Sequence, residues 1–551
     1  MKYTSSATHR AVAVAIILVW LVALLGLGAC TPKDSTPETP SEKTVVVAYP
    51  VDIKGVNELI NQSTAIHNGL LYFGLFLPLV EVLPGYEDGP AQFGPRLAES
   101  YEFSEDRLEL TFHLRKNVQW SDGEPVDADD VLFTWRAQMS PEVAWNFVDA
   151  KKRIDRVEKL DDHTVRFYFH EAYATQINEA NLGVILPEHV WGQRPFSEWR
   201  SDSDWFVENL VVNGPFELES WEPQQRFVLK RNENYFEPGL PKVDRIVFEI
   251  TRDAQSQIAK LRSGHAQMVE YVNPPDAQIV LENPELRLET FIPRFFYFLM
   301  WNISRPLFAE AEVRQALTMA IDRQNIIDTL HFGYGSLAYS PFPSNSWAHN
   351  KNIDLWPYDP ERAQQLLAEQ GWRDRDGDGL LDRDGQVFRF ELLTNSENPL
   401  RRDITVMIQE QLRRIGIAAE TRHMEFNALI GPLTQHEFDA VVTGVAIDTS
   451  FNTRFHFHTS AVTEGYNWGV YENPEVDRLI EEIEQSVDPV ESKKMFDRLQ
   501  EILRDDLPVT YLYEGRRLVG LHESLRDVKP NAINSFSNMR FWRLEEGDSA
   551  P

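Results

Sequence analysis

Residues 97–135 read LAESYEFSEDRLELTFHLRKNVQWSDGEPVDADDVLFTW and decide the class of fold. Within them, residues 101–114 alternate apolar and polar side chains around a Ser-Glu-Asp turn, which predicts a β-hairpin. Asp127 and Asp130 then precede an apolar stretch, where carboxylates accept free backbone N–H groups and oppose the positive end of a helix dipole. A hairpin followed by a capped helix predicts an α/β protein.

The flanking sequence continues this α/β pattern. Apolar and β-branched runs predict further strands at 44–49 (TVVVAY), 164–169, 226–230 and 245–250. Residues 312–329 carry apolar side chains at helical spacing, and the helical pattern of 407–415 stops at Gly416 before a strand at 417–420. These later segments predict a second α/β unit, and the sequence contains no internal repeat of about 20 to 50 residues that would favour a solenoid or propeller.

Length and charge limit the possible partners. The 551 residues exceed what one hydrophobic core normally organises, so we expect two or three compact units. With 42% hydrophobic and 25% charged residues, the composition is typical of folded globular proteins. The 85 acidic and 54 basic residues give a formal net charge of -31, which repels phosphate backbones and argues against nucleic acid as a partner.

The N-terminus has the pattern of an export signal. Lys2 and Arg10 precede an uncharged run over 11–29 that ends in Leu-Gly-Ala. We therefore predict a signal peptide over 1–29, and the alternative is an uncleaved membrane span, because the apolar run is nearly long enough to cross a bilayer. Cys30 follows the small residues directly and resembles the cysteine of the bacterial lipobox, which favours cleavage and acylation over a span.

Cys30 and the segment after it predict a lipid-anchored protein on a tether. Cys30 is the only cysteine, which excludes an intrachain disulfide. Residues 30–43 are rich in Pro, Ser, Thr and Glu and lack apolar periodicity, so they predict a flexible linker. Thr31, where inner-membrane lipoproteins of Gram-negative bacteria carry Asp, resembles the outer-membrane pattern, provided that the envelope is of that type.

From the hairpin onward, the mature chain resembles the peptide/nickel class of extracellular solute-binding proteins. The strongest match is 97–135, and shorter matches follow in order at 186–189 (LPEH), 213–216 (NGPF), 231–235 (RNENY), 313–316 (VRQA), 320–322 (AID) and 473–477 (NPEVD). Two departures concern the first lobe: GVNEL at 55–59 replaces the usual Leu-Asp-Pro, and Gln267 stands near a usually acidic position.

The resemblance implies an α/β, two-lobed periplasmic-binding-protein fold with a hinge and an extra subdomain on the first lobe. The implied first lobe comprises 44–285 with 512–545, including the subdomain at about 81–189, and the second lobe comprises 286–511. It also implies a monomeric binding protein on the periplasmic side of the cell envelope, which delivers oligopeptides to the permease of an ABC transporter in the inner membrane.

The implied ligand site lies in residues 440–448 (AVVTGVAID). The backbone of Gly444, Val445 and Ala446 would pair with a peptide, and Asp448 would hold its α-ammonium group. The alternative is that Asp448 caps the following loop. Trp468 and Asn467 complete the expected set of ligand contacts. Stacking of Trp468 on a flat sugar or chelate would instead favour an oligosaccharide, metal complex or haem as ligand.

Two further motifs suggest metals. Alternating carboxylates at Asp374, Asp376, Asp378 and Asp382 resemble the first part of a calcium loop, but Gly385 occupies the place of the closing Glu, so a polar turn without a cofactor is the favoured interpretation. His456 and His458 would share one face of an extended chain, a spacing that metals can use, although the sequence offers no third ligand nearby.

Catalytic motifs are not evident in the sequence. It contains no GxxxxGK[ST], HExxH or GxSxG pattern, so we do not expect an enzyme. A surface hydrolase remains a distant alternative, because a pair of carboxylates could meet in space without a sequence signature.

Overall fold

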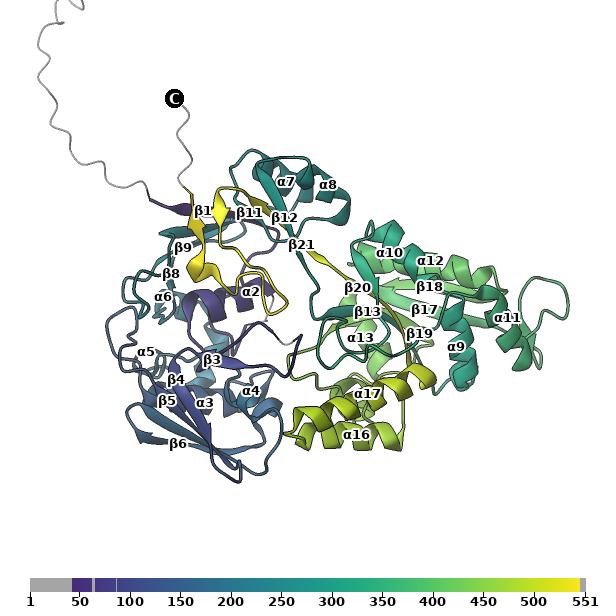
Figure 1. Ribbon diagram of the computed structural model, residues 1–551, viewed down its shortest axis with the longest axis horizontal. Coiled ribbons are helices and arrows are strands. Elements are labelled where there is room, and N and C mark those ends of the chain that lie inside the picture. The colour runs from purple at the N-terminus through teal and green to yellow at the C-terminus, as the bar shows by residue number, and fades with distance from the viewer. Residues whose placement is uncertain (1–41, 62–64, 86, 546–551) are drawn as a thin grey trace, which may run out of the picture. The chain divides into compact units, whose positions relative to one another are not determined.

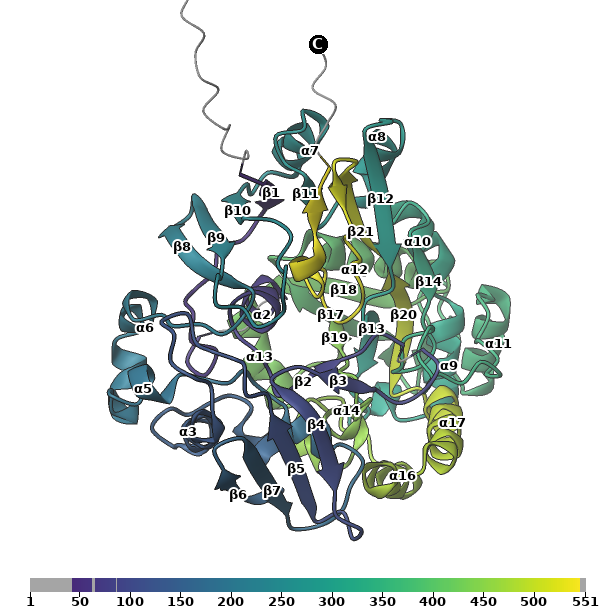
Figure 2. The ribbon, with the colours of Figure 1, turned by 60° about the vertical axis from the view of Figure 1, so that its left-hand side comes forward.

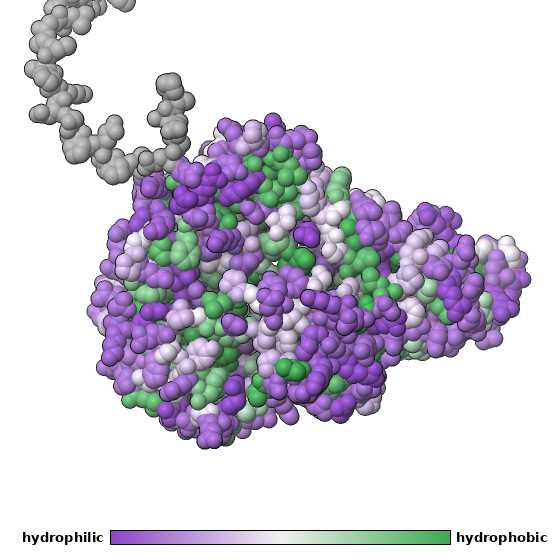
Figure 3. Space-filling model, viewed as in Figure 1, coloured by the Kyte–Doolittle hydropathy of each residue, from purple (hydrophilic) through white to green (hydrophobic). Residues whose placement is uncertain are grey.

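The computed structural model describes residues 42–61, 65–85 and 87–545 (Figure 1). The predicted signal peptide over 1–29, the expected lipid-bearing Cys30 and most of the predicted tether lie outside these residues. Within the described ranges, no helix combines the length and apolar character needed to cross a membrane. Figure 3 shows a mostly hydrophilic face, as the many charged residues lead one to expect.

The first lobe is built on a seven-stranded sheet. Its order is β12 (Leu286–Phe291), β21 (Arg517–His522), β11 (Met268–Val269), β1 (Thr44–Tyr49), β10 (Arg245–Ile250), β9 (Arg226–Arg231) and β8 (Phe216–Glu222). β1 pairs in parallel with β10 and β11, while β9 pairs antiparallel with β10. The strands predicted at 44–49, 226–230 and 245–250 are therefore confirmed.

The stretch 97–135 contributes two strands and most of a helix to the extra subdomain of this lobe, which has a sheet of its own. Its sheet has the order β4 (Ala98–Phe103), β5 (Glu109–Leu114), β7 (Thr164–Phe169) and β6 (Ile154–Asp161). β4 and β5 make the predicted hairpin, and α3 (Ala128–Met139) begins at a capping box formed by Asp127 and Asp130. Asp130 also accepts the indole N–H of buried Trp120 at 3.1 Å, so the cap ties helix and loop together.

The second lobe is built on a six-stranded sheet. Its order is β14 (Gly335–Leu337), β20 (Val509–Gly515), β13 (Phe295–Trp301), β19 (Ala440–Ala446), β17 (Arg389–Asn395) and β18 (Ala418–Met424). β13 pairs antiparallel with β19 and β20, and β17 pairs in parallel with β18 and β19. Two mixed sheets in separate lobes confirm the predicted two-lobed α/β fold.

The helices of the second lobe differ in detail from the sequence prediction. The single helix predicted over 312–329 is wrong: the chain forms α9 (Ala311–Met319) and α10 (Arg323–Leu330). Asp322 causes the break, because its carboxylate accepts the Asn325 N–H at 2.9 Å and starts a new helix. The helix predicted at 407–415 is the last part of α12 (Pro399–Arg413), which begins at the Asn398 cap.

The chain passes between the sheets through short connections. Residues 292–294 join β12 to β13, and Arg516 alone joins β20 to β21. Figure 2 shows β20 leading into β21 beside the β12–β13 connection. Both changes of sheet lie a few residues after the lobe boundaries at 285 and 511 that the resemblance implied. Such paired crossings are where two lobes can hinge.

Candidate functional site

β19 has an open edge where it faces away from β13. Ile447 N–H donates to Arg294 O at 2.9 Å, and the alternation of antiparallel pairing then turns the peptide groups of Gly444 and Ala446 to the opposite edge. On that edge β17 pairs with β19 only at Ala440 and Val441. Among the described strands, none therefore pairs with Gly444 and Ala446 on this side.

The neighbours of Gly444 leave no room for a side chain at this position. A Cβ at this position would lie 2.5 Å from Phe295 Cζ and 2.9 Å from Phe296 O, closer than a side chain can approach. The Phe295 ring packs edge-on against Tyr297 with centroids 5.1 Å apart, and Tyr297 stacks on Tyr513 at 4.8 Å. These three rings, Phe295, Tyr297 and Tyr513, form an aromatic wall beside the open edge.

Asp448 caps the loop that follows β19. Its Oδ1 accepts the Ser450 N–H at 2.8 Å and the Ser450 hydroxyl at 2.5 Å, which is the alternative that the sequence left open. The side chain is exposed, and both of these bonds use the same oxygen. Capping therefore leaves room for a ligand at Oδ2, and the predicted ammonium contact stays a prediction.

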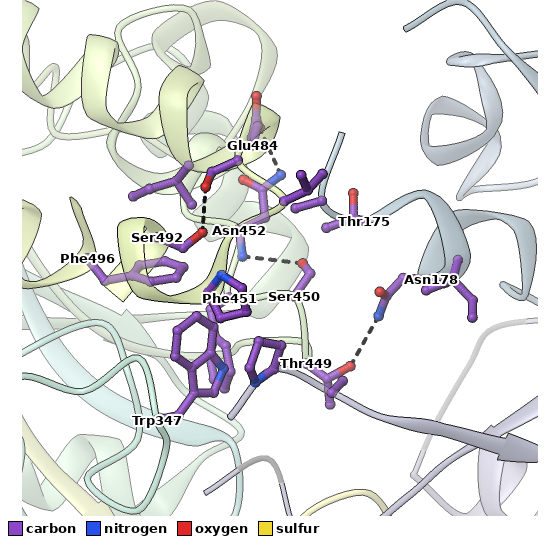
Figure 4. Close-up of a pocket in the computed structure, with 18 of the residues that line it drawn as sticks. Thr175, Asn178, Trp347, Thr449, Ser450, Phe451, Asn452, Glu484, Ser492 and Phe496 are labelled. Carbon is purple, nitrogen blue, oxygen red and sulfur yellow. Dashed lines mark hydrogen bonds between the residues drawn. The ribbon is translucent and has the colours of Figure 1, made fainter. Parts of the chain in front are cut away.

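A cavity of about 180 Å³ begins directly after Asp448 (Figure 4). Its walls come from both lobes and include Phe93, Arg107, Thr175 and Asn178 from the first and Trp347, Thr449, Phe451, Asn452, Glu484 and Phe496 from the second. Asn178 Nδ2 donates to Thr449 Oγ1 at 3.4 Å, and Ala174 N–H donates to Glu484 O at 2.9 Å. The lobes thus touch at this cavity.

The cavity has one carboxylate with charged and polar partners and one guanidinium with an unused donor. Glu484 accepts Arg454 Nη2 at 2.8 Å and Asn452 Nδ2 at 2.9 Å, so its charge is neutralised. Arg107 lies over the Phe103 ring at 4.1 Å, its Nε is buried without a hydrogen-bond partner in the described chain, and burial lowers the pKa of its guanidinium. The first lobe therefore offers a cation to the cavity.

Asn467 and Trp468 do not line the cavity. Asn467 is buried, and its amide serves its own lobe: Nδ2 donates to His458 O at 3.2 Å and Tyr471 O at 2.8 Å, while Oδ1 accepts the Tyr471 N–H at 3.0 Å. Trp468 is partly buried, packs edge-on against Tyr466 at 5.6 Å, and has no partner for its indole N–H in the described residues. Their ligand contacts stay predictions.

Residues 456–458 lack the fully extended conformation on which the two-histidine metal alternative depended. Arg454–Phe457 forms the short helix α14, so the two imidazoles do not lie on one face of a strand. Burial lowers the pKa of His456 to about 4, which keeps its ring neutral, while His458 Nδ1 lies 2.8 Å from Ser460 Oγ. These environments differ from a shared metal site.

The aspartate loop is held by its own backbone. Carboxylate oxygens of Asp374, Asp376 and Asp378 lie within 4.8 Å of one another. Asp374 nevertheless accepts the N–H groups of Gly377 and Gly379 at 2.7 and 3.1 Å, and Asp382 is paired with Arg375 at 2.6 Å. These bonds support the favoured interpretation, a polar turn, and the calcium alternative stays a prediction.

A family model described as bacterial extracellular solute-binding proteins, family 5 Middle, matches residues 92–466. The chain belongs to this family. As a family 5 solute-binding protein, it is 31% identical over 455 residues to the oligopeptide-binding protein AppA of Bacillus subtilis, covering 81% of this chain and 83% of AppA. It is also 25% identical to the dipeptide-binding protein of Escherichia coli, covering 94% and 98% of the two chains. The solved structure of Bacillus subtilis AppA in complex with a nonapeptide covers 92% of this chain and all of that one, with 29% identity and a TM-score of 0.76.

Sequence reasoning missed several residues of the candidate site in this family 5 protein. Phe295 and Tyr297 stand in the run FFYFLMW, which reads as a buried strand, and their position beside Gly444 depends on the pairing of distant strands. Arg107 follows the hairpin turn that the sequence did identify. An arginine next to the predicted turn was the only available signal, because the lack of a partner for its Nε is visible only in the folded chain.

Proposed function

We propose that this protein binds peptides outside the cytoplasm and delivers them to the permease of an ABC transporter without converting them chemically. The open edge of β19 at Gly444 and Ala446 carries the proposal, because an extended peptide can pair with free backbone groups whatever its side chains are. Membership of the family and similarity to AppA, solved with a nonapeptide, support it.

In this proposal, the peptide adds a strand to the second lobe and the first lobe closes over it. Asp448, exposed at the end of the open edge, would accept the peptide's α-ammonium group through the oxygen that the loop cap leaves unused. The contacts of Asn178 and Ala174 with the second lobe would help to hold the closed form. A permease could then recognise the closed form rather than the cargo.

We further propose that Cys30 is acylated, that residues 30–43 tether the folded body to the membrane, and that the protein acts as a monomer. The support is the sequence pattern around Cys30. The measurement is the intact mass of protein extracted from membranes. A diacylglycerol-sized addition on a chain that starts at Cys30, lost in Cys30→Ser, is the expected result, whereas an unmodified chain that retains residues 1–29 would contradict the anchor. Size-exclusion chromatography with light scattering tests the monomer, and a stable dimer would contradict it.

The experiment that tests peptide binding is native mass spectrometry of protein purified without added ligand. We expect a ladder of bound peptide masses, with Asp448→Ala weakening binding by about tenfold or more, since a charged ligand group would lose its partner. Exposed Glu233→Ala, in the first lobe, serves as the control. A single bound sugar, metal complex or haem would replace the peptide proposal, and a change in the ligand's mass on incubation would indicate an enzyme.

A further inference from the structure

Arg294 is the last residue of the connection that crosses from the first lobe to the second at 292–294. Its backbone oxygen accepts the Ile447 N–H at 2.9 Å, and its Nη1 donates to the Ile447 carbonyl at 3.1 Å. Ile447 is buried and directly precedes Asp448, the expected partner of the peptide's α-ammonium group. One arginine therefore holds both backbone polar groups of the residue before this anchor.

The side chain of Arg294 also reaches the first lobe. Its Nε donates to the Ala532 carbonyl at 3.2 Å. Ala532 lies in the segment that joins β22 (Leu525–Arg526) to the short helix η6 (Met539–Phe541). Figure 1 shows this yellow segment extending from the first lobe toward the second. The guanidinium therefore links a carbonyl of each lobe.

The segment around Ala532 is fixed to the first lobe and packs on the second. Ser535 Oγ donates to Glu270 Oε1 at 2.8 Å, and both of these side chains are buried in the first lobe. Ala532 and Val445 both pack against a hydrophobic core cluster of the second lobe. The carbonyl that Arg294 binds is therefore held by the first lobe at the surface of the second.

The second crossing between the lobes is held differently. Arg516 donates its backbone N–H to Tyr334 O at 3.0 Å, and Tyr334 packs against a hydrophobic cluster of the first lobe. Backbone pairing and apolar packing are sufficient to brace that connection. The first crossing instead uses a guanidinium with a bond to the residue before Asp448. Bracing a hinge does not by itself need such a link to the open edge of β19.

We propose that Arg294 is a positioning residue that couples closure of the lobes to the ammonium anchor Asp448. The inference rests on the proposed function and gives Arg294 no contact with the peptide. Its bond to Ile447 stays within the second lobe, whereas its bond to Ala532 crosses between the lobes. A guanidinium presents its donors in a rigid fork, so it binds both carbonyls only over a narrow range of lobe positions.

In the closed form, Asp448 is held from both sides. Arg294 fixes the peptide group before it, while the N–H and hydroxyl of Ser450 bind its Oδ1 from the residues after it. A carboxylate that is already oriented loses less conformational freedom when it binds an ammonium group. Opening of the lobes breaks the bond to Ala532 and loosens the anchor, so the peptide is freed and its ammonium group is released together.

The test is isothermal titration calorimetry with the best-binding member of an oligoalanine series, once with a free and once with an acetylated N-terminus. We expect the unmodified protein to prefer the free amine at least about tenfold, because acetylation removes the charge that Asp448 binds. Arg294→Gln should reduce this preference at least about threefold and leave the affinity for the acetylated peptide nearly unchanged, and Arg294→Lys should keep part of the preference. Stopped-flow fluorescence should show that the loss lies in faster dissociation.

Arg287→Gln is the matched control. Arg287 also donates to two backbone carbonyls, those of His522 at 3.3 Å and Leu525 at 2.6 Å, but all three residues belong to strands of the first lobe. This variant should leave the preference for the free amine unchanged. In the Asp448→Ala background, Arg294→Gln should not change the preference further, since the two residues act through one contact with the ligand.

An equal loss of affinity for both peptides in a folded Arg294→Gln would mean a purely structural role and overturn the inference. An unchanged preference in this variant, or effects of Arg294→Gln and Asp448→Ala that add, would have the same meaning. If Arg294→Gln does not fold, Arg294→Lys decides, because a fully retained preference contradicts the need for both carbonyl bonds. Equal binding of the two peptides to the unmodified protein would remove Asp448 as the anchor and the inference with it. Failure of both peptides to bind would instead refute the proposed function.

Discussion

Glu514 should make the stability of the second lobe depend on pH. It lies on β20 with only 3% of its surface exposed. Its carboxyl group accepts the Ser344 N–H at 2.8 Å and the Ser344 hydroxyl at 2.6 Å. Burial raises the pKa of this carboxyl from 4.5 to about 7, because the hydrogen bonds from Ser344 only partly offset the loss of hydration.

The difference in proton binding between the folded and unfolded chain decides whether stability rises or falls with pH. Between pH of about 4.5 and 7, the folded protein keeps a proton at Glu514 that the unfolded chain has released. This contribution to stability is therefore fully present below the lower value and is lost as the pH rises through the higher one. At about 1.4 kcal/mol per pKa unit, the loss is about 3 kcal/mol.

Glu514→Gln isolates this effect, because a neutral amide of the same shape mimics the protonated acid. We expect the free energy of unfolding of the variant, relative to the unmodified protein, to rise by about 3 kcal/mol between pH 4.5 and 8. Urea unfolding followed by tryptophan fluorescence across this range measures it. Burial also raises the pKa of Glu58 to about 7, but Glu58 is present in both proteins and cancels. Parallel pH profiles for the two proteins would refute the reasoning.

Three further outcomes follow. Gly444→Val should weaken peptide binding at least about tenfold in calorimetry, since its Cβ meets the Phe295 ring at 2.5 Å, whereas Val445→Ala should change affinity less than about threefold. The backbone bonds of the aspartate loop should hold it without metal, so EDTA should leave the melting temperature unchanged; a rise with Ca²⁺ that Asp376→Asn abolishes would establish a calcium site. Asn178→Ala should raise peptide dissociation rates in stopped-flow fluorescence, and unchanged rates would show that its contact with Thr449 does not hold the closed form.

Local signals explain what the sequence could predict. The hairpin of β4 and β5, the capping box of α3 and the strand β1 each depend on neighbouring residues, so alternation and capping chemistry were sufficient. The pattern around Asp322 predicts one continuous helix, because its apolar neighbours keep helical spacing across the break. A capping residue inside an apolar pattern marks a boundary that periodicity alone misses.

The binding surface depends on contacts between distant segments. Gly444 and Asp448 could be selected through family resemblance, but the aromatic wall arises from the register of β13 with β19, whose residues lie far apart in the chain.

The paired crossings at 292–294 and Arg516 have a mechanical consequence for cargo tolerance. Two short, adjacent connections limit the lobes mainly to rotation about one axis, with little freedom to slide or twist. A peptide held as an added strand has nearly the same backbone thickness whatever its composition. If the protein binds peptides as proposed, the angle at which rotation stops would be set by a dimension that all peptides share, so different cargoes would yield one common outer geometry for a transporter to recognise.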